Sequence, residues 1–81
     1  MQTETMNKII ESMDGWHTKE LRDVKHNCPI RIHKNPNNYA IENGTMVIMF
    51  TSYKFDDACQ RLVLFWNEYY IGSVDLRDVE L

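Results

Sequence analysis

The sequence predicts an α+β fold in which an N-terminal helical segment packs on an antiparallel sheet of four or five strands. Apolar residues follow a helical spacing at the start of the chain and alternate with polar residues from residue 29 onward. Two five-residue runs, 46–50 and 62–66, are apolar at every position, as in strands covered on both faces. The 81 residues suffice for one small core, so we expect a single domain over residues 1–81.

Residues 1–27 form the predicted helical segment. One face of its first helix carries four apolar residues: Met6, Ile9, Ile10 and Met13. Thr3 or Thr5 is expected to cap the start of this helix, because a hydroxyl oxygen can accept a hydrogen bond from a free N–H of the first turn. Gly15 is expected to end the helix.

A second short helix is predicted over residues 19–25, with Thr18 as its cap. Together the two helices would form a hairpin of the helix-turn-helix kind. In DNA binding the second helix enters the major groove, where Glu20 and Asp23 would be repelled by the phosphates. We therefore expect this hairpin to pack against the sheet.

Residues 29–81 are predicted to form the antiparallel sheet or a small barrel. Residues 35–38 are expected to be a loop, and residues 54–58 a loop or a single helical turn. The pairs at 43–44 and 67–68 are expected to be hairpin turns. The expected strands cover residues 29–34, 39–42, 45–53, 61–66 and 69–74, with two short pieces at the end. The strand at 45–53 is expected to be central.

The C-terminal half resembles an SH3-like barrel. Residues 39–50 (Tyr-Ala-Ile-Glu-Asn-Gly-Thr-Met-Val-Ile-Met-Phe) resemble a strand, a diverging turn and a second strand of that fold. Residues 72–81 (Gly-Ser-Val-Asp-Leu-Arg-Asp-Val-Glu-Leu) resemble its ending, a strand that enters a 3₁₀ turn and a final strand. The resemblance implies a small barrel. The chain lacks the tandem Trp of peptide-binding SH3 domains and has Asp75 at their Pro position, so recognition of proline-rich peptides is not implied.

Charge and hydropathy exclude several classes of protein. A net charge of −3 gives no broad basic surface, which disfavours non-specific DNA binding. Crossing a bilayer takes about 20 consecutive apolar residues, far more than either apolar run provides, so we expect no membrane association. Cys28 and Cys59 lack a paired spacing and no apolar signal segment precedes them. We therefore expect reduced thiols and a cytoplasmic location.

The sequence contains no diagnostic catalytic motif, so we expect no catalytic residues, no cofactor and no enzyme activity. Adjacent carboxylates at Asp56 and Asp57 are more typical of a solvated turn than of acid–base chemistry. One zinc-like set combines thiols and imidazoles: His26, Cys28, His33 and Cys59. The single residue between His26 and Cys28 is shorter than the usual ligand spacing, so we expect no metal site.

Aromatic residues in the second half supply the candidate binding surface. Tyrosine and tryptophan combine apolar area with a polar tip and few rotors, which favours them as anchors of protein interfaces. Two short helices cannot cover every aromatic side chain, so part of the set should be exposed. The predicted binding residues are four aromatics and two carboxylates of the acidic C-terminal end: Tyr53, Trp66, Tyr69, Tyr70, Asp75 and Asp78.

We expect a non-enzymatic protein-binding module that contacts a partner protein or forms a homodimer. Small acidic domains rich in Asn, Lys, Ile and Tyr are frequent among phage and mobile-element regulators, which suggests an inhibitor that occludes a host protein. The alternative is a small β-barrel that binds single-stranded nucleic acid by stacking bases on its aromatics. Four basic residues would then contact phosphates: Arg31, Lys34, Lys54 and Arg61.

Overall fold

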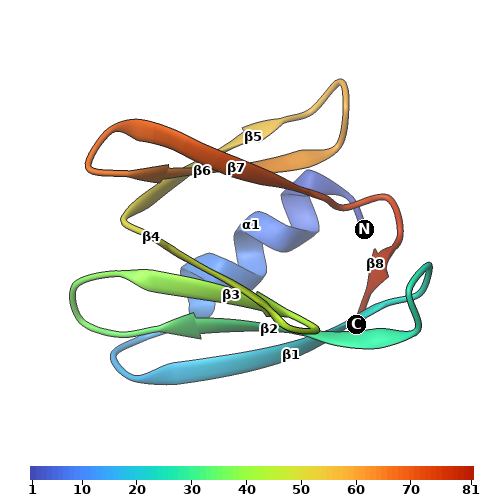
Figure 1. The fold of residues 1–81 in the computed structure, drawn as a ribbon, viewed down its shortest axis with the longest axis horizontal. Coiled ribbons are helices and arrows are strands. Elements are labelled where there is room, and N and C mark those ends of the chain that lie inside the picture. The colour runs from blue at the N-terminus through green and yellow to red at the C-terminus, as the bar shows by residue number, and fades with distance from the viewer.

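The protein consists of one helix and two antiparallel sheets, as a computed structural model of residues 1–81 describes it (Figure 1). The elements are α1 (Thr3–Ser12), β1 (His17–Asp23), β2 (Cys28–Lys34), β3 (Tyr39–Asn43), β4 (Met46–Phe50), β5 (Ser52–Asp56), β6 (Arg61–Trp66), β7 (Tyr69–Asp75) and β8 (Val79–Glu80). The five-stranded sheet has the order β4-β3-β2-β1-β8, and the three-stranded sheet has the order β5-β6-β7. The α+β prediction is therefore confirmed.

Helix α1 lies between the two sheets (Figure 1). Met6, Ile10 and Met13 are buried in the core, which confirms the apolar face that the spacing predicts. The predicted threonine cap is wrong, because Gln2 occupies the cap position and makes no side-chain bond to the helix. Thr3 instead donates its hydroxyl to Asp57 beyond β5, which ties the start of the helix to the smaller sheet.

The predicted second helix is wrong, because residues 17–23 form β1. This strand pairs with β2 over its whole length and with β8 at its end, so backbone pairing on both sides overrides the helical propensity of Lys-Glu-Leu-Arg. Leu21 and Asp23 alternate into the interior as a strand requires. The helix-turn-helix interpretation fails with it.

The inner face of the five-stranded sheet is a row of aliphatic side chains. Ile32 lies opposite Ile41, which lies opposite Ile48, and Leu21 lies opposite Ile30 on the same face. The outer face is polar by contrast. Ion pairs and hydrogen bonds cross it between adjacent strands: Glu20 to Arg31 at 2.9 Å, His33 to Glu42 at 3.0 Å and Thr18 to His33 at 2.9 Å.

The three-stranded sheet is centred on β6. Leu62 and Leu64 are fully buried, and the strand pairs with β5 on one side and β7 on the other. Asn67 and Glu68 both have positive φ, as in the tight two-residue turns that match strand twist, so the predicted β6–β7 hairpin is confirmed. A bulge interrupts the pairing between Leu64 and Phe65.

A bend at Thr51 corrects the predicted strand over residues 45–53 and the predicted loop over 54–58. The chain leaves the five-stranded sheet at the end of β4 and enters the three-stranded sheet as β5. The N–H of Thr51 donates to the carbonyl oxygen of Phe65 at 2.8 Å, and its hydroxyl accepts from the N–H of Asn67 at 2.9 Å. Because β4 has a neighbour on one side only, it is an edge strand.

The two sheets do not close into a barrel, so the resemblance to an SH3-like barrel extends only to a small antiparallel protein with one helix. No ladder joins the edge strands β4 and β7. The side chain of Ile48 in β4 approaches Gly72 in β7: a Cβ placed on Gly72 would lie 3.7 Å from Cδ1 of Ile48. The ten-residue helix α1 falls short of a membrane span in both length and apolar character.

Candidate functional site

The end of the β6–β7 hairpin carries most of the exposed aromatic surface. We call its four residues the aromatic hairpin: Trp66, Tyr69, Tyr70 and Ile71. Tyr69 is 77% exposed and Tyr70 is 64% exposed, while the other two side chains are partly exposed. Large side chains remain in water here because the hairpin extends past the interior that the helix fills. This is the surface that the sequence predicts from its aromatic run.

The aromatic hairpin presents side chains on both faces. Tyr70 lies opposite Phe65 on the outer face of the sheet, where their ring centroids are 6.4 Å apart. The ammonium of Lys54 lies 5.7 Å from the Phe65 ring centroid on that face. Trp66 and Tyr69 form the next pair and project to the opposite face, beyond the core. The surface is therefore a ridge that a partner can contact on both faces.

Tyr53, a predicted binding residue, lies apart from this ridge. It is half-buried on the inner face of β5, packed at ring-centroid distances of 5.7 Å from Tyr39 and Phe55. Burial, with the nearby Tyr39 and Glu11, raises the pKa of the Tyr53 hydroxyl above its ordinary value. Tyr53 therefore contributes to the core and not to the exposed aromatic hairpin.

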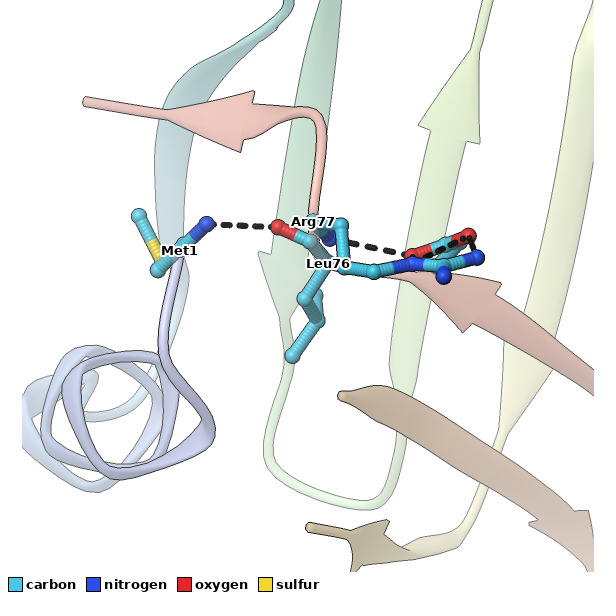
Figure 2. A network of polar contacts seen from close by, with 4 residues as sticks. Met1, Leu76 and Arg77 are labelled. Carbon is cyan, nitrogen blue, oxygen red and sulfur yellow. Dashed lines mark hydrogen bonds and ion pairs between the residues drawn. The ribbon is translucent and has the colours of Figure 1, made fainter. Parts of the chain in front are cut away.

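Asp75 and Asp78, the predicted acidic residues, are exposed at the far end of β7. The Arg77 guanidinium donates to both carboxylate oxygens of Asp75, with Nη2 to Oδ2 at 2.7 Å (Figure 2). These hydrogen bonds from Arg77 hold the pKa of Asp75 well below its usual range. Beside them the Met1 ammonium donates to the Leu76 carbonyl at 2.6 Å. Asp75 is therefore already paired, and Asp78 is the freer of the two charges.

A pocket of about 170 Å³ opens beside Asp75 and Asp78, between β7 and the inner face of the larger sheet. Its apolar floor contains four side chains: Ile30, Ile41, Met46 and Val74. Asp23 lines it and is only 5% exposed, the one buried charge of the chain. Its Oδ2 accepts from Asn43 Nδ2 at 3.2 Å and lies 2.7 Å from His26 Nδ1.

The network around Asp23 explains how the buried carboxylate is tolerated. Burial alone would raise the pKa of Asp23, but hydrogen bonds from the His26 side chain and backbone and from Asn43 outweigh it, so the pKa lies below 3.8. The Cys28 thiol extends the chain of contacts by donating to Asn43 Oδ1 at 3.0 Å. Both carboxylate oxygens of Asp23 and both side-chain polar atoms of Asn43 take part in these hydrogen bonds.

The histidines and cysteines considered for zinc make separate contacts. His26 pairs with Asp23, whereas His33 bridges Thr18 and Glu42 on the outer face of the larger sheet. Cys59 is an exposed free thiol in the turn after β5. Nowhere in residues 1–81 do three or more potential metal ligands gather in ion-binding arrangement.

Comparisons with known proteins leave the function to be inferred from the chain itself. No protein-family model, curated protein or solved structure matches the sequence or the fold.

Sequence reasoning missed two features of the surface. The first is the exposure of β4, whose Met46, Val47 and Met49 are all at least half exposed. The uniform apolar run concealed this, because composition cannot distinguish a central strand from an edge strand. The second is the buried Asp23, for which the only available signal is the Asp-x-x-His spacing of a turn closed by its own side chain.

Proposed function

We propose that this protein is a non-enzymatic protein-binding module that grips its partner with the aromatic hairpin. The observation that carries the proposal is the exposure of Tyr69 and Tyr70, with Trp66 and Ile71 beside them, on one two-stranded hairpin. Aromatic side chains held by strand pairing lose little conformational entropy when a partner covers them. Asp78 and the paired Asp75 form an acidic margin at the other end of β7.

The role we propose is that of a cytoplasmic phage or mobile-element regulator that inhibits a host protein by occlusion. The support is that the exposed groups are suited to covering a surface and that Cys28 and Cys59 are free thiols. The fold proposed with it is a barrel-like variant in which β4 and β7 stay open where SH3-like barrels close. Occlusion requires no catalytic group, only a buried contact area of standard size.

The experiment is capture of a partner with the double variant Tyr69→Ala/Tyr70→Ala beside the wild type. The protein is immobilised, and nuclease-treated lysates of candidate bacterial hosts are passed over it. The matched control is Trp16→Ala, which removes another large exposed aromatic from the loop between α1 and β1. We expect one stoichiometric partner that wild type and Trp16→Ala retain and the double variant loses.

The opposite result would reject the proposal. If the folded double variant retains the partner as well as wild type does, the aromatic hairpin is not the binding surface. If nuclease treatment removes all bound material, a nucleic acid and not a protein is the ligand.

A second candidate function is binding of single-stranded nucleic acid, and one observation favours it. Lys54, Phe65 and Tyr70 share the outer face of the three-stranded sheet, the arrangement of stacking rings beside a cation that such binders use. Arg61 lies on the same face. Arg31 and Lys34 belong to the other sheet, where Arg31 pairs with Glu20. Binding of an oligonucleotide that falls steeply with salt and is lost in Lys54→Ala would support this candidate.

A further inference from the structure

The pocket beside Asp75 and Asp78 has walls from both sheets. Ile30 and Ile41 line it from β2 and β3, Met46 lines it from β4, and residues 73–75 line it from β7. Its volume is about 170 Å³. An apolar cavity of about 150 Å³ holds one benzene ring, so this pocket suits a ligand of about five or six heavy atoms.

Asp23 is the most buried charged group of this lining. Its side chain is 7% exposed, against 40% for that of Asp75. Because the pKa of Asp23 lies below its ordinary value, the group is a carboxylate at neutral pH. It accepts hydrogen bonds from His26 and Asn43, but Asn43 is neutral and His26 is a cation only when protonated. With a neutral His26 the buried carboxylate lacks a counter-ion, which is unusual because buried charges are costly unless paired.

The remaining charges of the lining do not supply this counter-ion. Lys25 is the only lysine or arginine among the lining residues, and it takes part in no ion pair of the chain. Arg77 donates to both oxygens of Asp75 and is not part of the lining (Figure 2). The Asp78 side chain adds a third carboxylate. The pocket therefore combines an apolar floor with an excess of negative charge.

We propose that this pocket binds the ammonium end of a short alkyl chain, with the ammonium donating to Asp23 and the chain on the apolar floor. A carboxylate has about four acceptor positions, and three of those on Asp23 are occupied. An ammonium supplies both a donor for the fourth position and the missing positive charge. Free amines and lysine side chains carry this same group. The aromatic hairpin lies at the other end of β7, so this inference is independent of the proposed function.

Ligands of other charge fit the same lining less well. An anion would be repelled by three carboxylates: Asp23, Asp75 and Asp78. An uncharged chain would bury apolar surface but leave Asp23 without a counter-ion. The alkyl part should contribute through its contact with the floor, where each methylene that becomes buried strengthens binding by up to about fourfold.

The test titrates the isotope-labelled chain with n-butylammonium chloride and follows its amide shifts by NMR. Butan-1-ol and sodium butyrate are matched probes without charge and with the opposite charge, all at constant ionic strength. We expect saturable shifts at Asn43, Met46 and Val74 with a dissociation constant of about 1–10 mM. Butan-1-ol should bind about tenfold more weakly, since a hydrogen bond between charged groups is the stronger one, and butyrate should not bind. Tyr69 and Tyr70 should not shift.

Three substitutions locate the charge that matters. Asp23→Asn should abolish binding, because an amide carries no charge. Asp78→Asn, whose side chain makes no hydrogen bond or ion pair in the chain, should keep the fold and weaken binding about threefold. Asp14→Asn removes the same charge from the loop between α1 and β1 and should bind like wild type. Circular dichroism checks each fold, and if Asp23→Asn does not fold, Asp78→Asn and the uncharged probe still test the proposal.

A fourth probe, Nα-acetyl-lysine methylamide, distinguishes the two sources of the ammonium. Shifts at the same amides would show that a lysine side chain of a partner enters the pocket. Shifts with n-butylammonium alone would assign the pocket to free amines.

Several results would overturn the proposal. These are equal binding of n-butylammonium and butan-1-ol, unchanged binding in folded Asp23→Asn or Asp78→Asn, or no saturable shift at the three pocket amides. Shifts confined to Tyr69 and Tyr70 would place the cation on the aromatic rings and not in the pocket. None of these results bears on the capture experiment with Tyr69→Ala/Tyr70→Ala, so the two proposals can fail separately.

Discussion

The strands β4 and β6 carry apolar runs of the same length and nearly the same composition, yet the two runs are buried to different extents. In β6, Leu62 and Leu64 are fully buried, and strands pair on both of its sides. In β4, Phe50 alone is buried, one side is paired, and Val47 and Met49 face solvent. Hydrophobicity sets what a strand can bury, whereas its place in the sheet order sets how much it does bury.

The cause lies in the connections of each strand. A short turn at each end places β6 between β5 and β7, so neighbours that are local in sequence occupy both sides. After β4 the chain bends at Thr51 into the other sheet, and no local neighbour is left for the free side. The exposed apolar edge is thus a consequence of one bend, and the following substitutions test it.

Leu64→Asp should have the largest effect, complete unfolding, because it places an unpaired charge in a fully buried site. The cost of several kcal/mol is comparable to the whole stability of a domain of this size. The paired substitution Met49→Asp should fold, with a free energy of unfolding within about 1 kcal/mol of wild type, because that side chain is half in water. Thermal and urea denaturation followed by circular dichroism measure both. Similar melting temperatures for the two variants would remove the distinction between the strands.

Phe50→Ala should be the most costly truncation within β4, about 3–5 kcal/mol. Its ring is fully buried and contacts Tyr39 at a centroid distance of 5.2 Å. Met49→Ala, one residue away on the other face, should cost under about 1 kcal/mol. Urea denaturation of both variants resolves this difference, and a cost at Met49 as large as that at Phe50 would place β4 in the interior after all.

The strand positions that the sequence predicts well are those fixed by local signals. Alternation and Asn-Gly or Asn-Glu turns identify β2, β3, β6 and β7 within a residue or two. Local signals do not predict the strand at residues 17–23, because its pairing with β2 and β8 outweighs a local preference for helix.

In the candidate site, too, the sequence predicts the side chains that local signals position and misplaces those positioned by distant contacts. Tyr69 and Tyr70 are exposed because they follow a tight turn at the end of a hairpin, which the sequence shows. Tyr53 faces inward because the bend at Thr51 shifts the alternation by one residue: Phe50 points inward, and so does Tyr53 in place of Ser52. At the bend, Thr51 forms a backbone hydrogen bond to Phe65, and no local sequence pattern predicts this contact.

Acid should loosen the β3–β4 hairpin before it affects β6. The pKa of Asp23 in the folded state lies below its ordinary value of 3.8, so its contribution to stability is fully present above that pH and is lost as pH falls through the folded pKa. Asn43, which lies next to the turn of this hairpin, donates to that carboxylate. Amide exchange below about pH 4 should therefore rise in the hairpin first.

Asp23→Asn is the control for this acid effect, since it removes the titrating group while keeping a similar shape. The variant should be less stable than wild type at neutral pH, and the difference should shrink as the pH is lowered. A constant difference between the two proteins across the acid range would mean that Asp23 does not link pH to this hairpin.

Glu68→Gly should have the smallest effect on the free energy of unfolding. Unlike the other substitutions, it should stabilise the protein. Glu68 has φ +73°, a left-handed conformation that costs a non-glycine residue about 1 kcal/mol, and Asn67 beside it tolerates φ +47° better. Glycine relieves the strain but gains freedom in the unfolded chain, so we expect a net stabilisation of about 0.5 kcal/mol. Asn67→Gly should change stability less. Because this turn holds β7 against β6, a destabilised Glu68→Gly would show that the Glu68 side chain, and not the turn geometry, secures the central strand.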